Sequence, residues 1–188
     1  MTFTDEELIA GCCKNDHHAQ ESLYQKYARS MYTVALRYVK LEQEAEDILQ
    51  EAFVKVFQKI DSFRQDSSLP YWIKRIVVNT ALNHQRSKLY LYPMVDVNDL
   101  KDWSVQENAL STYSHNELLL MIKELPDGCR IIFNLYAIEG YKHHEIAEML
   151  EISEGTSKSQ YSRAKSLLKD KLERNNLMNY GQLGEQRG

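Results

Sequence analysis

The stretch that decides the fold is His144-Glu-Ile-Ala-Glu-Met-Leu-Glu-Ile-Ser-Glu-Gly-Thr-Ser-Lys-Ser-Gln-Tyr-Ser-Arg-Ala-Lys165. It predicts a short helix, a tight turn and a longer helix, because Ile146 and Leu150 recur at helical spacing and Ser153 is a favourable N-cap. Ala147 is small, which lets the second helix cross the first closely. Together these features indicate a helix-turn-helix, whose second helix is shaped to enter the major groove of DNA.

The second helix carries polar and basic side chains that suit DNA. Gln and Arg can form paired hydrogen bonds with base edges, and Ser, Thr and Lys can contact bases or phosphates. An ordinary solvated helix with the same surface charge is the open alternative on this pattern alone. The candidate DNA-binding residues here are Thr156, Lys158, Ser159, Gln160, Arg163 and Lys165.

Composition favours a helical, cytoplasmic protein. Glycine and proline are scarce, at seven and three of 188 residues, and 43% of the residues are hydrophobic. No apolar run approaches the roughly 18 residues of a membrane span, and the acidic N-terminus lacks a signal-peptide pattern. The three cysteines disfavour a disulfide scaffold. A net charge of −4 implies that the free protein binds DNA weakly or that a partner supplies most phosphate contacts.

The apolar periodicity predicts an all-α fold of two small helical domains joined by a flexible linker. We expect the first domain at residues 5–88, the linker at 89–112, the helix-turn-helix domain at 113–175 and a C-terminal tail at 176–188. In the first domain two apolar stripes predict buried helix faces, one from Leu23 to Tyr38 and one along residues 45–60: Leu23, Tyr27, Met31, Val34, Ala35 and Tyr38, then Ala45, Ile48, Leu49, Ala52, Phe53, Val56, Phe57 and Ile60.

A proline and a glycine indicate where two of the helices begin or end. Residues 61–70 are expected to form a loop, and Pro70 at its end fits the first turn of the next helix. Gly140 is expected to be a left-handed cap for a helix that contains Ile132, Phe133 and Leu135.

Three segments together resemble the extracytoplasmic-function group of sigma-70 family RNA polymerase sigma factors. They are Ala45–Phe57, Trp72–Arg86 and Leu125–Gly140, the last of which runs into the helix-turn-helix. They occur in the order of the family's domain two, linker and domain four, and the resemblance covers residues 5–175. The wording Glu154-Gly-Thr-Ser-Lys-Ser-Gln160 is similar to versions common in the Bacteroidetes.

The resemblance implies an initiation factor without catalytic activity of its own. It would bind core RNA polymerase, through the clamp coiled coil of the largest subunit and the flap region. Residues 45–60 would dock on the coiled coil, since an acidic, amide-bearing face beside an exposed aromatic suits a basic, partly apolar helix. A solvated face of a core helix is the simpler interpretation without the family. The residues that match the docking motif are Asp47, Gln50, Glu51 and Phe53.

The resemblance also implies recognition of two promoter elements. Domain four would read the −35 element as duplex, and domain two would hold the melted −10 element as a single strand, with the loop from Phe63 to Leu69 forming a pocket for a flipped base. Periodicity places Trp72 in the core rather than on a stacking platform. The candidate −10 residues are Phe63, Ser67, Lys74, Arg75, Asn79, Asn83 and Arg86.

Several positions depart from the usual pattern of the family. Glu151 stands at a turn position where glycine is common, so the turn is expected to be slightly strained or differently shaped. Ser157 replaces the usual valine, Gln160 a frequent arginine and Asn83 a frequent aspartate. A base-reading Gln160 would favour adenine.

No cofactor, metal or small-molecule substrate is expected. The segment from His143 to Glu148 lacks the second histidine of a zincin helix. The remaining metal or redox candidate is the group of Cys12, Cys13, His17 and His18, but the two adjacent cysteines point to different helix faces.

The resemblance further implies an anti-sigma factor, usually membrane-bound in this group, and a linker that runs through the polymerase cleft with Asp96, Asp99 and Asp102 mimicking nucleic-acid charge.

Two other functions stay open. A stand-alone helix-turn-helix regulator would bind duplex DNA without polymerase, and an antagonist that mimics a sigma factor would lack DNA reading. Residues 45–57 and 72–86 argue against the regulator, and Lys158, Gln160 and Arg163 against the antagonist.

Overall fold

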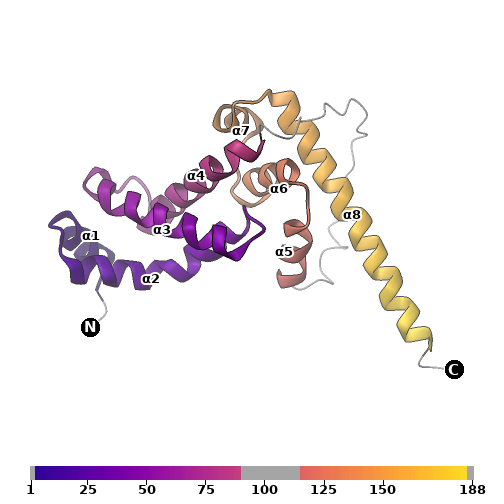
Figure 1. Ribbon diagram of the computed structural model, residues 1–188, viewed down its shortest axis with the longest axis horizontal. Coiled ribbons are helices and arrows are strands. Elements are labelled where there is room, and N and C mark those ends of the chain that lie inside the picture. The colour runs from indigo at the N-terminus through magenta and orange to yellow at the C-terminus, as the bar shows by residue number, and fades with distance from the viewer. Residues whose placement is uncertain (1–2, 90–114, 186–188) are drawn as a thin grey trace. The chain divides into compact units, whose positions relative to one another are not determined.

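The structure is a computed structural model that describes residues 3–89 and 115–185. The chain divides into two compact units, Met1–Ser87 and Lys88–Gly188. Regular structure in the described residues is helical throughout, which confirms the all-α prediction (Figure 1). None of the helices in these residues combines the length and apolar character that a membrane crossing requires. The predicted linker aspartates, Asp96, Asp99 and Asp102, lie outside the described residues.

The N-terminal unit is built around the contacts of α2 with its neighbours. α2 (His17–Leu36) packs against α1 (Asp5–Cys13) and against α3 (Glu42–Lys59), which runs into the short turn η1 (Ile60–Ser62). α4 (Leu69–Leu89) completes the unit, and Pro70 lies in its first turn as predicted. Both predicted apolar stripes are buried apart from the half-buried Phe57, because these side chains recur on the inward face of α2 and α3.

Close backbone approach and one polar cluster fix α1 on α2. A Cβ atom on Gly11 would lie 2.4 Å from the Cβ of Ala19, so only glycine allows this approach. The carboxylate of Asp5 accepts hydrogen bonds from Lys26 Nζ at 2.7 Å and from the Tyr27 hydroxyl at 2.6 Å. These bonds lower the pKa of Asp5, led by the bond from Lys26.

The C-terminal unit contains the predicted helix-turn-helix. Its elements are α5 (His115–Lys123), α6 (Asp127–Phe133), a π-helical segment η3 (Asn134–Ile138), α7 (His143–Leu150) and α8 (Glu154–Glu185). The sequence predicted one regular helix up to Gly140, whereas the structure widens into a π turn, in which the Glu139 N–H donates to the Asn134 carbonyl at 2.9 Å. Gly140 has φ of 82°, so the left-handed cap is confirmed. The segment predicted as a tail is helical up to Glu185.

A buried arginine holds the corner between α5 and α6. Arg130 is 1% exposed, pairs with Asp127 at 2.8 Å and donates to the Leu125 carbonyl at 3.2 Å. A buried charge is tolerated only when it is paired and hydrogen-bonded, and Arg130 meets both conditions. Arg130 therefore fixes α6 in its contact with α8. Ile122, Leu125 and Ala164 form part of the core of this unit.

The turn between α7 and α8 is left-handed at Glu151, with φ of 56° and ψ of 43°. The Ile152 N–H donates to the Ala147 carbonyl at 3.0 Å, which closes the end of α7. Ser153 then caps α8, because its hydroxyl accepts a hydrogen bond from the Thr156 N–H at 2.9 Å. Both the strained turn and the N-cap agree with the sequence prediction.

We predict that Glu151→Gly is more stable than Glu151→Ala by about 1 kcal/mol, because only glycine adopts the left-handed conformation without steric cost. Both substitutions remove the carboxyl group of Glu151, so the difference between them reports the cost of a Cβ atom in this backbone conformation. Urea unfolding followed by circular dichroism measures it. Equal stability of the two variants would contradict a strained turn.

Candidate nucleic-acid and polymerase interfaces

The helix-turn-helix presents an outward face on α8. Ser157, Gln160 and Ala164 face the interior of the unit, whereas Lys158 and Arg163 are exposed. Helical spacing sets this division, since residues three and four apart share a face. Of the predicted DNA-binding residues, Lys158 and Arg163 are therefore the most accessible.

The structure corrects the assignment of Gln160. This side chain is only 5% exposed, and its carbonyl oxygen accepts a hydrogen bond from the Cys129 thiol at 3.0 Å. A buried amide held in this way does not face a DNA groove. The sequence-based assignment was wrong because glutamine is usually a surface residue, and its buried partner Cys129 is 31 residues away in the chain.

The remaining predicted residues of α8 are partly engaged with the helix itself. The Ser159 hydroxyl donates to the Thr156 carbonyl at 3.0 Å, and Lys165 Nζ lies 5.1 Å above the ring of Tyr161. Lys158 pairs with Glu154 at 2.6 Å, but both side chains are well exposed. Because an exposed ion pair contributes little to stability, a phosphate group could replace Glu154 as the partner of Lys158 at little cost.

Ser162 was missed by the sequence analysis. It lies four residues after Lys158 and three after Ser159, and so belongs to the same outward face of α8. Helical spacing alone could have identified it.

An aromatic and imidazole cluster joins η3, α7 and α8. The His143 ring stacks on Tyr136, with ring centroids 4.3 Å apart and an interplanar angle of 15°, and lies 5.8 Å from Tyr161. His143 Nδ1 lies 2.9 Å from the hydroxyl oxygen of the fully buried Ser157. Burial lowers the pKa of His143, and the positive charge of Lys158 lowers it further.

The α3 face predicted to dock on polymerase is exposed at Asp47, Gln50 and Glu51. Phe53, in contrast, is 2% exposed, so its assignment as an exposed aromatic was wrong. Its ring is in edge contact with Tyr24 at 4.8 Å, because Phe53 belongs to the apolar stripe that packs on α2.

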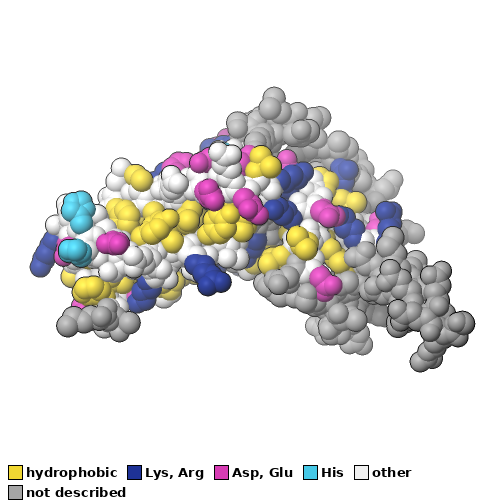
Figure 2. Space-filling model, turned by 60° about the horizontal axis from the view of Figure 1, so that its bottom comes forward, with side chains coloured by type: hydrophobic (Ala, Val, Ile, Leu, Met, Phe, Trp, Pro, Cys, Tyr) yellow, Lys and Arg dark blue, Asp and Glu magenta, His cyan; other side chains and the backbone are white. Residues whose placement is uncertain are grey.

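The aromatic rings beside the acidic face come from α2 instead. Tyr24 and Tyr32 line a shallow groove with Glu46, Leu49 and Gln50 of α3. Figure 2 shows hydrophobic side chains in a band along the N-terminal unit, with acidic side chains beside it. The sequence could not predict this groove, because it depends on how α2 packs on α3.

A polar stripe runs along α4. Arg75, Asn79 and Asn83 recur every four residues and are exposed, and the half-buried Arg86 continues the stripe. Lys74 lies with its Nζ 5.3 Å above the ring of Tyr71.

A second aromatic pair joins the loop before α4 to α4 itself. Phe63 and Trp72 are both half-buried, with ring centroids 5.2 Å apart, and Ser67 is also half-buried. Trp72 is thus more accessible than the sequence indicated. Tyr71, which is exposed beside Lys74, is a further candidate that the sequence analysis missed.

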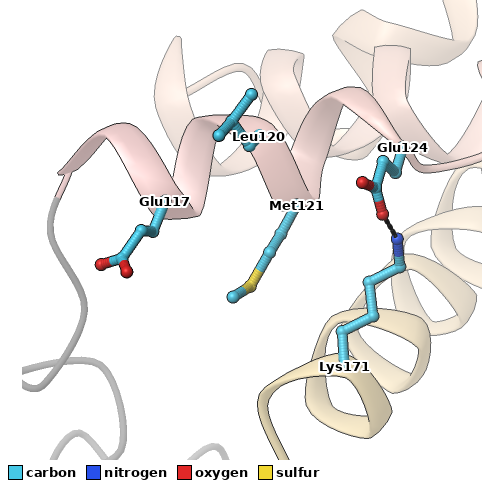
Figure 3. A pocket seen from close by; sticks show the side chains of 5 residues that line it. All are labelled: Glu117, Leu120, Met121, Glu124 and Lys171. Carbon is cyan, nitrogen blue, oxygen red and sulfur yellow. Dashed lines mark hydrogen bonds and ion pairs between the residues drawn. The ribbon is translucent and has the colours of Figure 1, made fainter. Parts of the chain in front are cut away.

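A second shallow groove lies between α5 and α8 (Figure 3). Leu120 and Met121 form its apolar part, with Glu117 on one side and the Lys171–Glu124 ion pair on the other. Among the described residues no His, Cys, Asp or Glu side chains gather in a group that could hold a metal ion, and this includes the area around Cys12, Cys13, His17 and His18.

Comparison with known proteins identifies both units. Residues 23–89 match the family Sigma-70 region 2, and residues 115–168 match Sigma-70, region 4. The chain is 30% identical to the ECF RNA polymerase sigma-E factor of Escherichia coli (strain K12) over 183 residues, which cover 91% of this chain and 95% of that protein. It is also 30% identical to the RNA polymerase sigma-H factor of Pseudomonas aeruginosa, over 87% of this chain and 91% of the relative.

A solved structure has the same fold. The sigma factor RpoE from Bartonella quintana, determined in complex with the anti-sigma factor NepR, matches with a TM-score of 0.50 and 20% sequence identity, over 81% of this chain and 96% of that one.

The chain therefore belongs to the sigma-70 family of RNA polymerase sigma factors, in the extracytoplasmic-function group. Proteins of this family are initiation factors rather than catalysts, and they act by binding core RNA polymerase and promoter DNA.

We predict that only one of the three cysteines reacts quickly with a thiol reagent at pH 8. Cys13 is exposed, whereas Cys12 and Cys129 are buried. Burial also raises the pKa of Cys12 to about 11 and raises that of Cys129, which leaves little reactive thiolate. Mass spectrometry of the labelled, folded protein gives the rate at each site. Fast labelling of Cys129 would show that α6 does not pack on α8 as described.

Proposed function

We propose that each exposed helix face has a separate role in promoter recognition. The α3 face would bind core polymerase, the α4 stripe with its loop would hold the melted −10 element, and the outward face of α8 would read the −35 element. The observation that carries this assignment is the division of charge. The α3 face bears Asp47, Gln50 and Glu51, whereas the exposed charged residues of the α4 stripe and of the α8 reading face include Arg75, Lys158 and Arg163.

The α3 face suits a basic protein partner. Its exposed carboxylates would repel DNA phosphates, and the groove with Tyr24 and Tyr32 offers apolar contact at its edge. Electrostatic complementarity of this kind mainly raises the rate of association and excludes wrong partners. We therefore place the clamp coiled coil of the polymerase along this face.

The α4 stripe suits single-stranded DNA. Asn79 and Asn83 can hydrogen-bond to bases or sugars, Arg75 can neutralise phosphate, and the exposed ring of Tyr71 offers a face on which a base can stack. The loop from Phe63 to Leu69 lies at the start of the same helix and would receive a flipped base.

The outward face of α8 suits duplex DNA. Lys158, Ser159, Ser162 and Arg163 form a compact set on one side of the helix, which is the geometry of a recognition helix in the major groove. Gln160 is not part of this set.

Other partners follow from the same function. A contact with the polymerase flap region would fall to the C-terminal unit, where the groove of Figure 3 has the exposed Leu120 beside the largely buried Met121. The anti-sigma complex of the solved relative supports an anti-sigma factor as regulator.

The protein would work in the cytoplasm beside RNA polymerase, with domain two at residues 5–88, a linker at 89–112 and domain four at 113–175. A Bacteroidetes origin stays a prediction.

The test is transcription by core RNA polymerase on a promoter library, with and without the purified protein. Start sites that depend on the protein support the proposal and give both promoter elements at once. Core binding without initiation would instead indicate an antagonist. Selection of duplex DNA by the protein alone, without core binding, would indicate a stand-alone regulator.

We predict that Asp47→Lys weakens binding to core polymerase about tenfold, because it replaces an attractive charge with a repulsive one. Glu6→Lys makes the same change of charge at an exposed position of α1 and serves as the control. Fluorescence anisotropy of the labelled protein titrated with core measures the affinity. If both variants weaken binding equally, the α3 face is not the docking surface.

We predict different effects for the two basic residues of α8. Arg163→Ala should cost about 1–3 kcal/mol and relax the base preference at one position of the −35 element, whereas Lys158→Ala should weaken promoter binding evenly across sequences and lower the salt slope by about 1. Lys14→Ala is the control, since this exposed lysine lies in the N-terminal unit. Filter binding of the holoenzyme at several salt concentrations distinguishes the outcomes, and an unchanged preference in Arg163→Ala would remove that residue from the reading face.

A further inference from the structure

The buried face of α8 contains two polar side chains, one turn apart. Ser157 is fully buried and Gln160 nearly so, and both lie on the same side as the fully buried Ala164. Burying a hydroxyl or an amide costs hydration that an apolar side chain would not lose. Such positions are tolerated only when a partner restores the hydrogen bond.

Each of the two has a partner on a different helix. Ser157 meets His143 Nδ1 of α7 at 2.9 Å, and Gln160 accepts from the Cys129 thiol of α6 at 3.0 Å. His143 is itself held by its stack on Tyr136 of η3. The recognition helix is therefore tied by directional bonds to both helices that support it.

Two directional bonds restrict a helix more than apolar contacts do. Apolar side chains can slide past one another at small cost, but a shift of one residue along α8 turns its side chains by about 100° and takes both bonds out of reach. In some coiled coils, a single buried polar residue selects one register among similar packings. Lys158 and Ser159 follow Ser157 directly, so their direction depends on the same register.

We propose that the His143–Ser157 and Cys129–Gln160 hydrogen bonds position the recognition helix, and that they thereby determine which base pairs its outward side chains read. The four residues are positioning residues that act from inside the unit. This inference rests on the proposed function, in which α8 reads the −35 element as duplex.

The experiment uses the holoenzyme on the promoter that the wild-type protein selects. It compares initiation from this promoter with initiation from the same promoter carrying a scrambled −35 element. The variants are Ser157→Ala with Gln160→Met, which remove both hydrogen bonds with little change in volume, and His143→Phe, which keeps an aromatic ring against Tyr136 but lacks the ring nitrogen. Asp170→Asn, exposed on α8, is the control.

We expect the Ser157→Ala, Gln160→Met protein to fold and to bind core as the wild type does. Side-chain volume is nearly kept, the Cys129 thiol left behind is only a weak donor, and the half-buried His143 can bond to water. Its discrimination between the two promoters should fall about tenfold, since misdirected side chains lose specific base contacts. His143→Phe should lose discrimination as well. Adding Ser157→Ala to it should cause no further loss, because both changes break the same bond.

Three results are decisive. Loss of discrimination with core binding and unfolding unchanged supports the inference, because a purely structural role would not change the ratio of the two promoters. Full discrimination in the double variant, or in His143→Phe if the double variant fails to fold, overturns it. A wild-type protein that ignores the −35 element rejects the proposed function itself and, with it, the positioning role.

Discussion

The constraint on which this structure depends is that each helix has one face buried against its neighbours and only the opposite face left for binding. The apolar stripes of α2 and α3 fix which way α3 turns, and so leave Asp47, Gln50 and Glu51 outside. The inward face of α8 likewise directs Lys158 and Arg163 outwards. Burial of apolar area supplies most of the free energy of such packing. The binding surfaces therefore follow from the core, and a residue that joins the core cannot also contact a partner.

Local chemistry sharpens this arrangement where the helices meet. Arg130 joins the ends of α5 and α6, Glu151 accepts a left-handed conformation so that α8 can turn back on α7, and Ser153 caps the new helix. None of these residues contacts DNA in the proposed function, but Glu151 and Ser153 control where α8 begins, and Arg130 holds the helices that support it. Together with the buried polar pairs, they make the direction of α8 a property of the whole C-terminal unit.

The sequence could predict features that depend on one helix at a time. Stripes at helical spacing gave the buried faces of α2 and α3, and the residue types of Ser153, Pro70 and Gly140 gave helix ends, since capping needs only local geometry. Features that depend on two elements were missed. The groove of Tyr24 and Tyr32 needs the packing of α2 on α3, and the burial of Gln160 needs its partner Cys129. Phe53 is a different case, because its place in the apolar stripe already predicted its burial, and only its description as an exposed aromatic was wrong.

The central claim is that one unit holds the −10 element melted while the other reads the −35 element as duplex. Permanganate reactivity of thymines in a promoter bound by core polymerase and this protein tests it most directly, because only unpaired thymines react. We expect reactive thymines at the −10 element, only when the protein is present, and unreactive thymines at the −35 element. A stably bound promoter whose −10 thymines stay unreactive would contradict the account.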